Sequence, residues 1–423
     1  MKICVPSRDS RGLDGAPHGH FGSASFLPGV TTHLSRFMIV SPPAMLAEAA
    51  RLREIGVSDA LERTTISGDA LVVTPYQRAA NRLRELSRGD GRHGSCGMGI
   101  GETASDALRP GGDAVFVRDL LDPAGLRRKL RLMRDRKLAE LAEIIGRCRD
   151  NAAAGPELAP FETDGIAECF AELGAALVRQ VRVVDAGFLK PLLDRPGCVI
   201  FEGAQGVLLD EARGFHPYTT WSKCTAENAL SLLGDAGYDG RVTRLGLVRA
   251  YATRHGPGPF VTEDAALTAA LPDAHNVRDD WQRDFRVGWP DLPATRYAIA
   301  ACGGIDALAV SCLDRLEPLR SWSVCDGYDL PASAANIDRY FVRGERRPGL
   351  VTDIRLGPAR DLAYQAKLTE LLLQARPAYA ASTAAPDFAG RCREHLGRLA
   401  AGLGAPVFIA SYGPTAGDKR FLF

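Results

Sequence analysis

The chain has 423 residues, of which 46% are apolar and 24% are charged, the balance of a globular protein and not of a disordered or fibrous one. Lysines and arginines number 52 and aspartates and glutamates 51, so the net charge is only +1. Such a chain has no global field to attract nucleic acid or an anionic membrane. An anionic ligand therefore needs a local binding site.

Ten cysteines form no Cys-x-x-Cys pair and no metal-ligand spacing, and no secretory signal precedes them. The longest apolar stretches are far too short to span a bilayer. The sequence thus predicts a cytoplasmic protein with reduced thiols that binds neither nucleic acid nor membrane.

Two helices are predicted from their caps. Ser41-Pro42 opens a helix over 44–55, which Gly56 ends, and Asp122-Pro123 opens a long helix in which Leu130, Met133 and Lys137 recur at helical spacing. We expect the arginine-rich polar face of the long helix to be solvated surface. Alanine, glycine and proline over 151–160 predict a loop between subdomains.

Three short apolar runs, 198–201, 307–310 and 407–410, each end in a polar loop. Interspersed with capped helices, they predict strands of a mostly parallel sheet, in which ligands bind beyond the carboxyl ends of the strands. Any one of the loops alone could be an ordinary turn. Three loops with usable side chains favour a binding site.

A long motif follows the first run. Glu202-Gly203-Ala204-Gln205-Gly206 precedes Asp210 and Pro217-Tyr218-Thr219-Thr220. The glycines let backbone amides approach an oxyanion or a ring, the amide of Gln205 can donate and accept at a purine edge, and Thr220 offers a hydroxyl to a phosphate. A glycine-rich turn with a buried glutamine is the alternative. The joint pattern closely resembles the signature of the adenylosuccinate synthetase family around inosine monophosphate (IMP).

Further motifs resemble the same family in the same order. The stretch 93–101 resembles its Thr-Thr-Gly-x-Gly-Ile-Gly phosphate segment, with Ser95 and Cys96 in place of the threonines; a thiol is the poorer donor. Arg109 is the nearest candidate for the family's arginine that reaches the phosphate of the partner subunit. The resemblance therefore implies that IMP is bound by Ser95, Cys96, Arg109, Gln205 and Thr220.

The stretch 281–291 lies where the family has its aspartate-binding loop, after a run, 249–263, that also resembles it. Arg283 and Arg286 are kept, and a guanidinium fork suits bidentate capture of carboxylates. Phe285 replaces the middle arginine and 280–282 replaces Thr-Thr-Gly, so the amine substrate stays open. Surface charge is the alternative reading of these arginines.

The stretch 311–314 matches the family's guanine-reading Thr-Lys-Leu-Asp, with Asp314 kept and Cys312 in place of the lysine. Ser411 and Gly413 match the Ser-x-Gly-Pro turn that closes over the same base. An aspartate can accept the ring N–H and the amino hydrogens of guanine, which distinguishes GTP from ATP. The resemblance thus implies a GTP site at Asp314, Ser411 and Gly413.

As a whole, the resemblance implies an α/β fold: a large, mostly parallel sheet flanked by helices, P-loop-NTPase-like, with the family's first strand missing. Residues 20–423 form the family-like domain and 1–19 are unmatched. Two catalytic segments of the family do not occur in the sequence: the Gly-Asp-Glu-Gly-Lys-Gly-Lys loop, whose Asp is the base and binds magnesium, and the Asn-Asn-Ala-Gly-His-Thr segment, whose His assists phosphoryl transfer. A truncated reading frame, a non-catalytic paralogue and a rebuilt site would each explain this, so we assign no catalytic residue and no metal ligand. We expect the chain alone to make no adenylosuccinate at a measurable rate.

The activity implied is ligation of aspartate to IMP, using GTP and Mg²⁺, by a homodimer in purine nucleotide biosynthesis. Two alternatives stay open. One is a ligase that joins an amino acid to another purine-like acceptor in secondary metabolism, favoured by Cys96, Phe285 and Cys312. The other is a nucleotide-binding protein without turnover.

Overall fold

The computed structural model describes residues 19–273, 276, 281–282, 284–331, 336–345, 349–380, 383 and 385–422. The chain divides into two compact units. Unit 1 comprises the described part of Met1–Ala204 together with Asn228–Asp239, and unit 2 comprises the described parts of Gln205–Glu227 and Gly240–Phe423. None of the described helices has an apolar stretch of the length that a bilayer requires.

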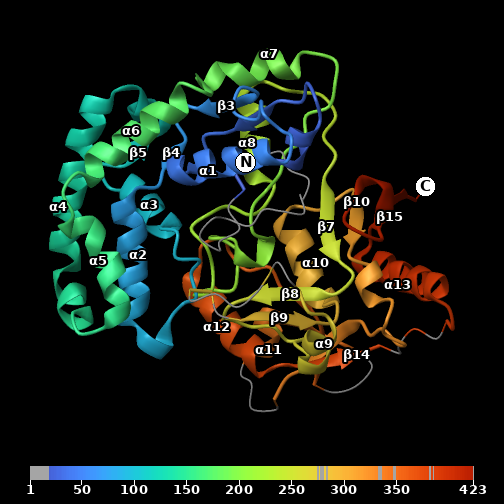
Figure 1. The fold of residues 1–423 in the computed structure, drawn as a ribbon. Helices are drawn as coiled ribbons and strands as arrows, with labels where there is room; N and C mark the ends of the chain where they lie inside the picture. The colour runs from blue at the N-terminus through green and yellow to red at the C-terminus, as the bar shows by residue number, and fades with distance from the viewer. Residues whose placement is uncertain are drawn as a thin grey trace. The chain divides into compact units, whose positions relative to one another are not determined.

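Unit 1 is rich in helices, several of which pack against one another: α2, α4, α5 and α6 lie side by side (Figure 1). Its helices are α1 (Pro42–Glu54), α2 (Pro75–Ser87), α3 (Ile100–Ala107), α4 (Pro123–Cys148), α5 (Gly155–Glu162), α6 (Ile166–Val178), α7 (Leu189–Leu193) and α8 (Glu227–Asp235), the last starting one residue before the unit. Its strands are β1 (Thr32–Leu34), β2 (Ile39–Val40), β3 (Thr64–Ser67), β4 (Leu71–Val72), β5 (Val115–Phe116) and β6 (Arg182–Val184). They form the parallel sheet β1-β3-β6 and the mixed sheet β2-β4-β5.

Both predicted helices of unit 1 are confirmed. Helix α1 starts at Pro42, directly after Ser41, and Gly56 follows its end with a left-handed φ of 94°. At α4 the carboxylate of Asp122 accepts a bond of 3.0 Å from the amide of Gly125, which satisfies one free donor of the first turn. Leucines and Met133 on one face of α4 are fully buried, so this face forms core.

The loop predicted over 151–160 is wrong, because most of it forms α5. Pro156 lies in the first turn of that helix, where no amide hydrogen is needed. Phe161 at its end is 1% exposed and packs against Tyr76 of α2, with ring centroids 5.7 Å apart. Burial of this aromatic side chain stabilises a helix that its alanine, glycine and proline content alone does not predict.

Unit 2 is built around strand β10, which pairs in parallel with β15 on one side and β7 on the other. Its helices are α9 (Ala265–Ala270), α10 (Leu292–Ala301), α11 (Ile337–Tyr340), α12 (Leu362–Gln374) and α13 (Phe388–Leu403). Its strands are β7 (Leu245–Arg249), β8 (Ala252–His255), β9 (Phe285–Gly288), β10 (Ala307–Ser311), β11 (Cys325–Asp329), β12 (Phe341–Arg343), β13 (Leu350–Ile354), β14 (Arg376–Tyr379), β15 (Val407–Ser411) and β16 (Lys419–Phe421). The sheets run in the orders β16-β15-β10-β7, β12-β13-β11-β14 and β8-β9.

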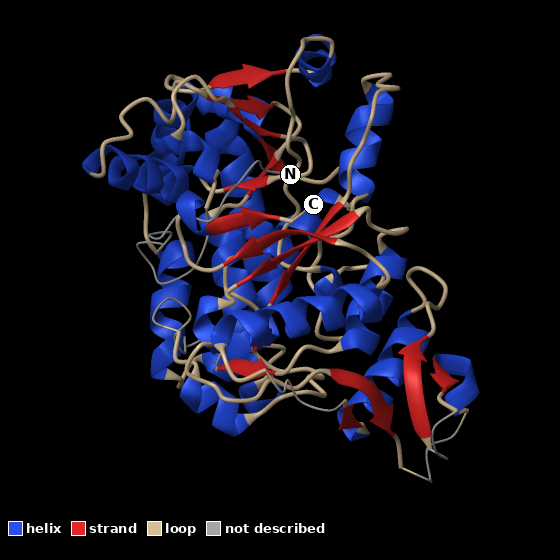
Figure 2. Ribbon diagram, turned by 90° about the vertical axis from the view of Figure 1, so that its right-hand side faces the viewer, coloured by secondary structure: helices blue, strands red, loops and turns tan. Residues whose placement is uncertain are grey.

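The predicted α/β class is confirmed, since parallel strands alternate with helices along the chain (Figure 2). Two of the three predicted strands, 307–310 and 407–410, are β10 and β15 and are neighbours. The third is wrong: 198–201 forms no strand, and Ile200 is 54% exposed. A run of apolar residues becomes a strand only where a neighbouring strand hydrogen-bonds to its backbone N–H and C=O groups, and no described strand does so here. The described strands also form five sheets in place of one large sheet.

Candidate active site

Asp210 organises the loop that carries the long motif. Its carboxylate is 2% exposed and accepts three backbone hydrogen bonds, from the amides of Ala212 (2.8 Å), Arg213 (2.9 Å) and Cys224 (2.6 Å). The amide of Thr220 also donates to the carbonyl of Leu209 at 2.8 Å. A buried carboxylate group needs hydrogen-bond donors to replace the water that it loses. The loop over 209–224 is therefore held as a rigid unit.

Gln205 lies at the edge of this loop with its side chain exposed and its backbone at a φ of 55°. Its amide oxygen accepts from the thiol of Cys224 at 3.6 Å. Burial raises the pKa of Cys224 to about 12, so this thiol stays protonated and can donate. The amide nitrogen of Gln205 donates to none of the described residues. Exposure rules out the alternative of a buried glutamine and leaves this side chain able to bind a ligand.

The phosphate segment, residues 95–101, lies in unit 1 and is anchored to α2. Asn81 donates to the hydroxyl of Ser95 at 3.1 Å and accepts from the amide of Gly99 at 3.3 Å. Gly99 has a φ of 81°, and a Cβ atom there would lie 2.8 Å from the backbone nitrogen of Arg78, so only glycine fits. The segment leads directly into α3, whose first amide hydrogens are available to an anion. Cys96 is partly buried in it.

Arg109 is 42% exposed in its side chain and donates to Glu140 of α4, in the same unit, at 3.1 Å. A role toward a partner subunit would require this exposed pair to separate. Surface ion pairs of this kind contribute little to stability, so separation costs little. The assignment of Arg109 stays a prediction.

Arg286 and Arg254 are cross-strand neighbours on β9 and β8. Arg286 donates to Glu263 at 2.6 Å and to the carbonyls of Gly256 (2.6 Å) and Gly258 (3.0 Å). Burial, with the charge of Arg286 second, lowers the pKa of Arg254 to about 10. Two guanidinium groups so close together favour an anion, although Glu263 already occupies part of the fork of Arg286. Arg283 lies outside the described residues.

Asp314, Ser411 and Gly413 are brought together at one edge of the β10 sheet. Val310 pairs with Ala410, so both strands end at the same level, and the amide of Leu313 donates to the carbonyl of Ser411 at 3.1 Å. Ser411 donates to the carbonyl of Gly413 at 3.0 Å. The carboxylate of Asp314 is partly buried and accepts no bond from the described residues. Two neighbouring strand ends thus form a site with a free acceptor.

Cys312 occupies a left-handed backbone position, φ 64°, and its side chain packs against the core of unit 2. It therefore does not replace the family's lysine toward a ligand. Lys419 of β16 instead lies at the same turn, where its ammonium group donates to the carbonyls of Gly413 (2.7 Å) and Thr415 (2.9 Å). No sequence motif marks Lys419 or Asn81. Asn81 bonds to Ser95 and Gly99, which are 14 and 18 residues away in the sequence, and Lys419 bonds across the turn that precedes β16. Sequence analysis quoted Asp210 without a role, although an Asp followed by two turn amides is a local pattern.

Comparisons with known proteins agree with these motifs. The sequence model of the adenylosuccinate synthetase family matches residues 18–354. Adenylosuccinate synthetase of Thermobifida fusca (strain YX) is 34% identical over 312 residues, 73% of this chain and 68% of that protein. The enzyme of Bordetella petrii is 30% identical over 401 residues, 93% of this chain and 84% of that protein.

Two solved structures share the fold. Fully ligated adenylosuccinate synthetase of Plasmodium falciparum superposes with a TM-score of 0.72 at 16% identity, over 100% of this chain and 90% of that chain. The succinoaminodeoxyadenylate synthetase of cyanophage S-2L, bound to dGMP and to dATP as an energy donor, superposes with a TM-score of 0.51 at 17% identity. The superposition covers 97% of this chain and 82% of that chain. At these identities the likeness concerns the fold alone. The family model and the two sequence relatives go further, and this chain belongs to the adenylosuccinate synthetase family of ligases.

Proposed function

We propose that this protein joins aspartate to IMP at the expense of GTP and so forms adenylosuccinate, a step of purine nucleotide biosynthesis. GTP would transfer its terminal phosphoryl group to the 6-oxygen of the purine, and the amine of aspartate would then displace that phosphate. The observation that carries the proposal is the rigid loop around Asp210, which presents the open amide of Gln205 and the hydroxyl of Thr220.

Each unit, taken by itself, offers groups that suit IMP. Gln205 offers a donor to the purine edge, and Thr220, Ser95 and the amides that begin α3 suit its phosphate. Cys96 and Arg109 would complete the phosphate contacts. Because Asp210 and Asn81 fix these groups before the ligand arrives, binding needs little further ordering.

The guanine of GTP would lie against Asp314, Ser411 and Gly413. A carboxylate without a partner among the described residues suits the ring N–H and the amino group of guanine, and it would repel the acceptor edge of adenine. Arg286, with Arg283, would bind the carboxylates of aspartate once Glu263 moves aside.

Magnesium accompanies phosphoryl transfer in general. Within the described part of the chain, no group of three or more side chains could hold a metal ion, so no described residue is assigned to magnesium. We further propose that the protein acts as a homodimer in the cytoplasm, in which Arg109 reaches the phosphate in the partner subunit.

Calorimetric titration with IMP tests the proposal. We expect Gln205→Ala to weaken IMP binding by about tenfold, the usual effect of removing one hydrogen bond to a ligand, relative to the unmodified chain. Gln374→Ala is the matched control, since Gln374 is an exposed glutamine of the same unit that donates only to the carbonyl of Glu370. Equal affinities of the unmodified chain and Gln205→Ala would remove Gln205 from the site.

A second candidate is a ligase for another purine acceptor. Phe285 stands where the family has an arginine, and its ring packs on His255 with centroids 4.8 Å apart, so it offers no charge to a substrate. GTP-dependent consumption of aspartate should be assayed with IMP, GMP and dGMP side by side. Turnover with IMP but not with GMP or dGMP supports the first proposal, and turnover with another of these acceptors supports the second. Nucleotide binding without any turnover is the outcome expected of this chain alone, because the Gly-Asp-Glu-Gly-Lys-Gly-Lys loop does not occur in its sequence, and it would indicate a binding protein.

A further inference from the structure

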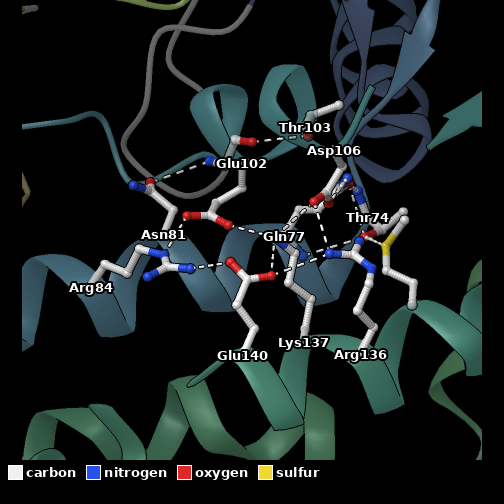
Figure 3. A network of polar contacts seen from close by, with 12 residues as sticks. Thr74, Gln77, Asn81, Arg84, Glu102, Thr103, Asp106, Arg136, Lys137 and Glu140 are labelled. Atoms are coloured by element: carbon white, nitrogen blue, oxygen red, sulfur yellow. Dashed lines mark hydrogen bonds and ion pairs between the residues drawn. The ribbon is translucent and has the colours of Figure 1, made fainter. Parts of the chain in front are cut away.

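A network of eight charged side chains joins α2, α3 and α4 in unit 1, and of its members only Arg109 has a part in the chemistry proposed above. Figure 3 labels the members that lie on the three helices. We call it the ion network. It contains Arg84, Glu102, Asp106, Arg109, Asp113, Arg136, Lys137 and Glu140. Cations and anions in this set are equal in number, so the network is neutral when every group is ionised.

Lys137 lies at its centre with a side chain that is 0% exposed. Its ammonium group contacts Glu102 at 2.6 Å, Asp106 at 3.0 Å and Glu140 at 3.6 Å. In Figure 3 the side chain rises from α4 toward the two acidic residues of α3. A lysine without access to water is tolerated only because these carboxylates surround it.

Asp106 is also 0% exposed. Burial raises the pKa of its carboxyl, but bonds from Arg136 (3.1 Å) and Gln77 (2.8 Å) and the charge of Lys137 outweigh burial and lower the pKa overall. Asp106 is therefore ionised at neutral pH. Its partners come from α2 and α4, so the carboxylate ties α3 to both neighbouring helices.

The network acts on the element that ends the phosphate segment. Glu102 and Asp106 are one turn apart on α3, and α3 begins directly after Gly99. Thr103 donates to the carbonyl of Gly99 at 2.9 Å, which joins the first turn of the helix to the segment. On the α2 side, Asn81 holds Ser95. A shift of α3 would therefore move the amides that face the ligand.

Stability alone does not account for such a cluster. Replacing a buried ion pair by apolar residues of similar volume is often neutral or stabilising, whereas removing one partner is strongly destabilising. What an ion pair adds is a defined geometry, because short charge-assisted bonds hold their atoms in one arrangement. An apolar contact would let the helices slide.

We infer that Lys137 and Glu102 are positioning residues for the phosphate of the purine nucleotide: they hold α3 so that Ser95 and the amides over 97–101 face it. The inference rests on the proposed function for the identity of the ligand. It extends that function to a buried pair that would touch neither substrate.

Two variants and a control separate positioning from stability. Lys137→Met leaves the network with an excess negative charge, and Lys137→Met/Glu102→Gln restores its balance. In the double variant Asp106 keeps Arg136, and Arg84 keeps Glu140, so every remaining charge has a partner. Lys129→Met is the matched control: it makes the same change on the same helix and breaks a bond of 2.8 Å to Asp119, away from α3.

The three variants are compared by melting temperature, by hydrogen exchange of the amides over 95–101 and by calorimetric titration with IMP. We expect Lys137→Met to lower the melting temperature and the double variant to regain most of the loss. Both should exchange the segment's amides about tenfold faster or more and bind IMP at least about tenfold more weakly, while Lys129→Met changes neither. The inference would be overturned if the double variant regained slow amide exchange and the original affinity for IMP along with its melting temperature.

The two proposals fail in different ways. If the unmodified chain does not bind IMP while exchange in the segment still rises in both Lys137 variants, the proposed function is wrong and the positioning role stands. If the unmodified chain binds IMP and neither exchange nor affinity changes, the positioning role is wrong and the proposed function stands.

Discussion

At the scale of single residues, we expect the choice of nucleotide to depend on one carboxylate. Asp314 follows β10 and has no partner among the described residues, so it is free to accept from guanine. Asp314→Asn exchanges one acceptor oxygen for a donor. We expect this change to lower the preference for GTP over ATP by about ten- to a hundredfold, the range for a polar group left unpaired. Competition between the two nucleotides in a binding titration measures it.

The same strand supplies the control. Asp306 directly precedes β10, at the opposite end of that strand from Asp314, and its carboxylate accepts from the amide of Arg244 at 2.6 Å. Asp306→Asn should leave nucleotide preference unchanged. An unmodified chain that prefers ATP would refute the guanine assignment, whatever the variants do.

At the scale of elements, helix α10 depends on a buried acid. Asp291 caps it by accepting from the amide of Ala294 at 3.0 Å, and Tyr328 donates to the same carboxylate oxygen at 2.5 Å. Burial outweighs both bonds and raises the pKa of Asp291 to about 6, from 3.8. An acid whose pKa is higher in the folded chain than in the unfolded chain stabilises the fold at pH values below the unfolded pKa. This stabilisation is lost as the pH rises through the folded pKa.

Asp291→Asn keeps the cap and the acceptor for Tyr328 but removes the titration. Relative to the unmodified chain, its free energy of unfolding should therefore increase by about 3 kcal/mol between pH 4 and pH 7. Urea unfolding followed by tryptophan fluorescence measures this, because all four tryptophans, 221, 281, 289 and 322, lie in unit 2. A difference between the two chains that is independent of pH would show that folding does not raise the pKa of Asp291.

Local rules predicted elements whose determinants are local. The cap of α4 and the strands β10 and β15 followed from short patterns at Asp122 and in the two apolar runs. Helix α5 and the irregular stretch 198–201 did not, since the first depends on packing against α2 and the second on the lack of a described partner strand. Helical periodicity grouped Lys137 with the buried residues of its helix, and Glu140 is its local i+3 neighbour, but Glu102 and Asp106 come from another helix and follow from no local pattern.

At the scale of the whole molecule, two buried groups of unit 2 respond to acid in opposite directions. His395 of α13 is 0% exposed and bonds to the carbonyl of Ala250 at 2.9 Å. Burial lowers its pKa from 6.5 to about 4, so acidification protonates the unfolded chain first and destabilises the fold between those values. The loss is about 3 kcal/mol and opposes the gain from Asp291.

We therefore expect the two contributions to cancel between about pH 4 and pH 6.5 in the unmodified chain. His395→Gln should make unit 2 more stable in acid, relative to the unmodified chain, by about 3 kcal/mol. The double variant with Asp291→Asn should return to the pH profile of the unmodified chain. The same urea titrations at several pH values provide the measurement, and a double variant that follows either single variant would contradict it.

Across the molecule, motifs named candidate residues but not the contacts that hold them. Gln205, Thr220, Asp314, Ser411 and Gly413 were all named from sequence, and the structure places the last three at one sheet edge. The motifs did not show how these residues are held: Asp210 bonds to Cys224 and Asn81 to Ser95, each 14 residues away, and Lys419 bonds across a turn to Gly413. They also did not show that Arg286 already bonds to Glu263.

Strand β16 has a practical consequence. It runs antiparallel to β15, and through Lys419 it fastens the turn that carries Gly413. Truncation of the chain into β16, or a purification tag fused directly after this strand, would disturb the bonds of Lys419 before it disturbed the core. Preparations handled in that way should remain folded yet discriminate guanine from adenine less well, and a tag placed elsewhere avoids mistaking such damage for an intrinsic property of the ligase.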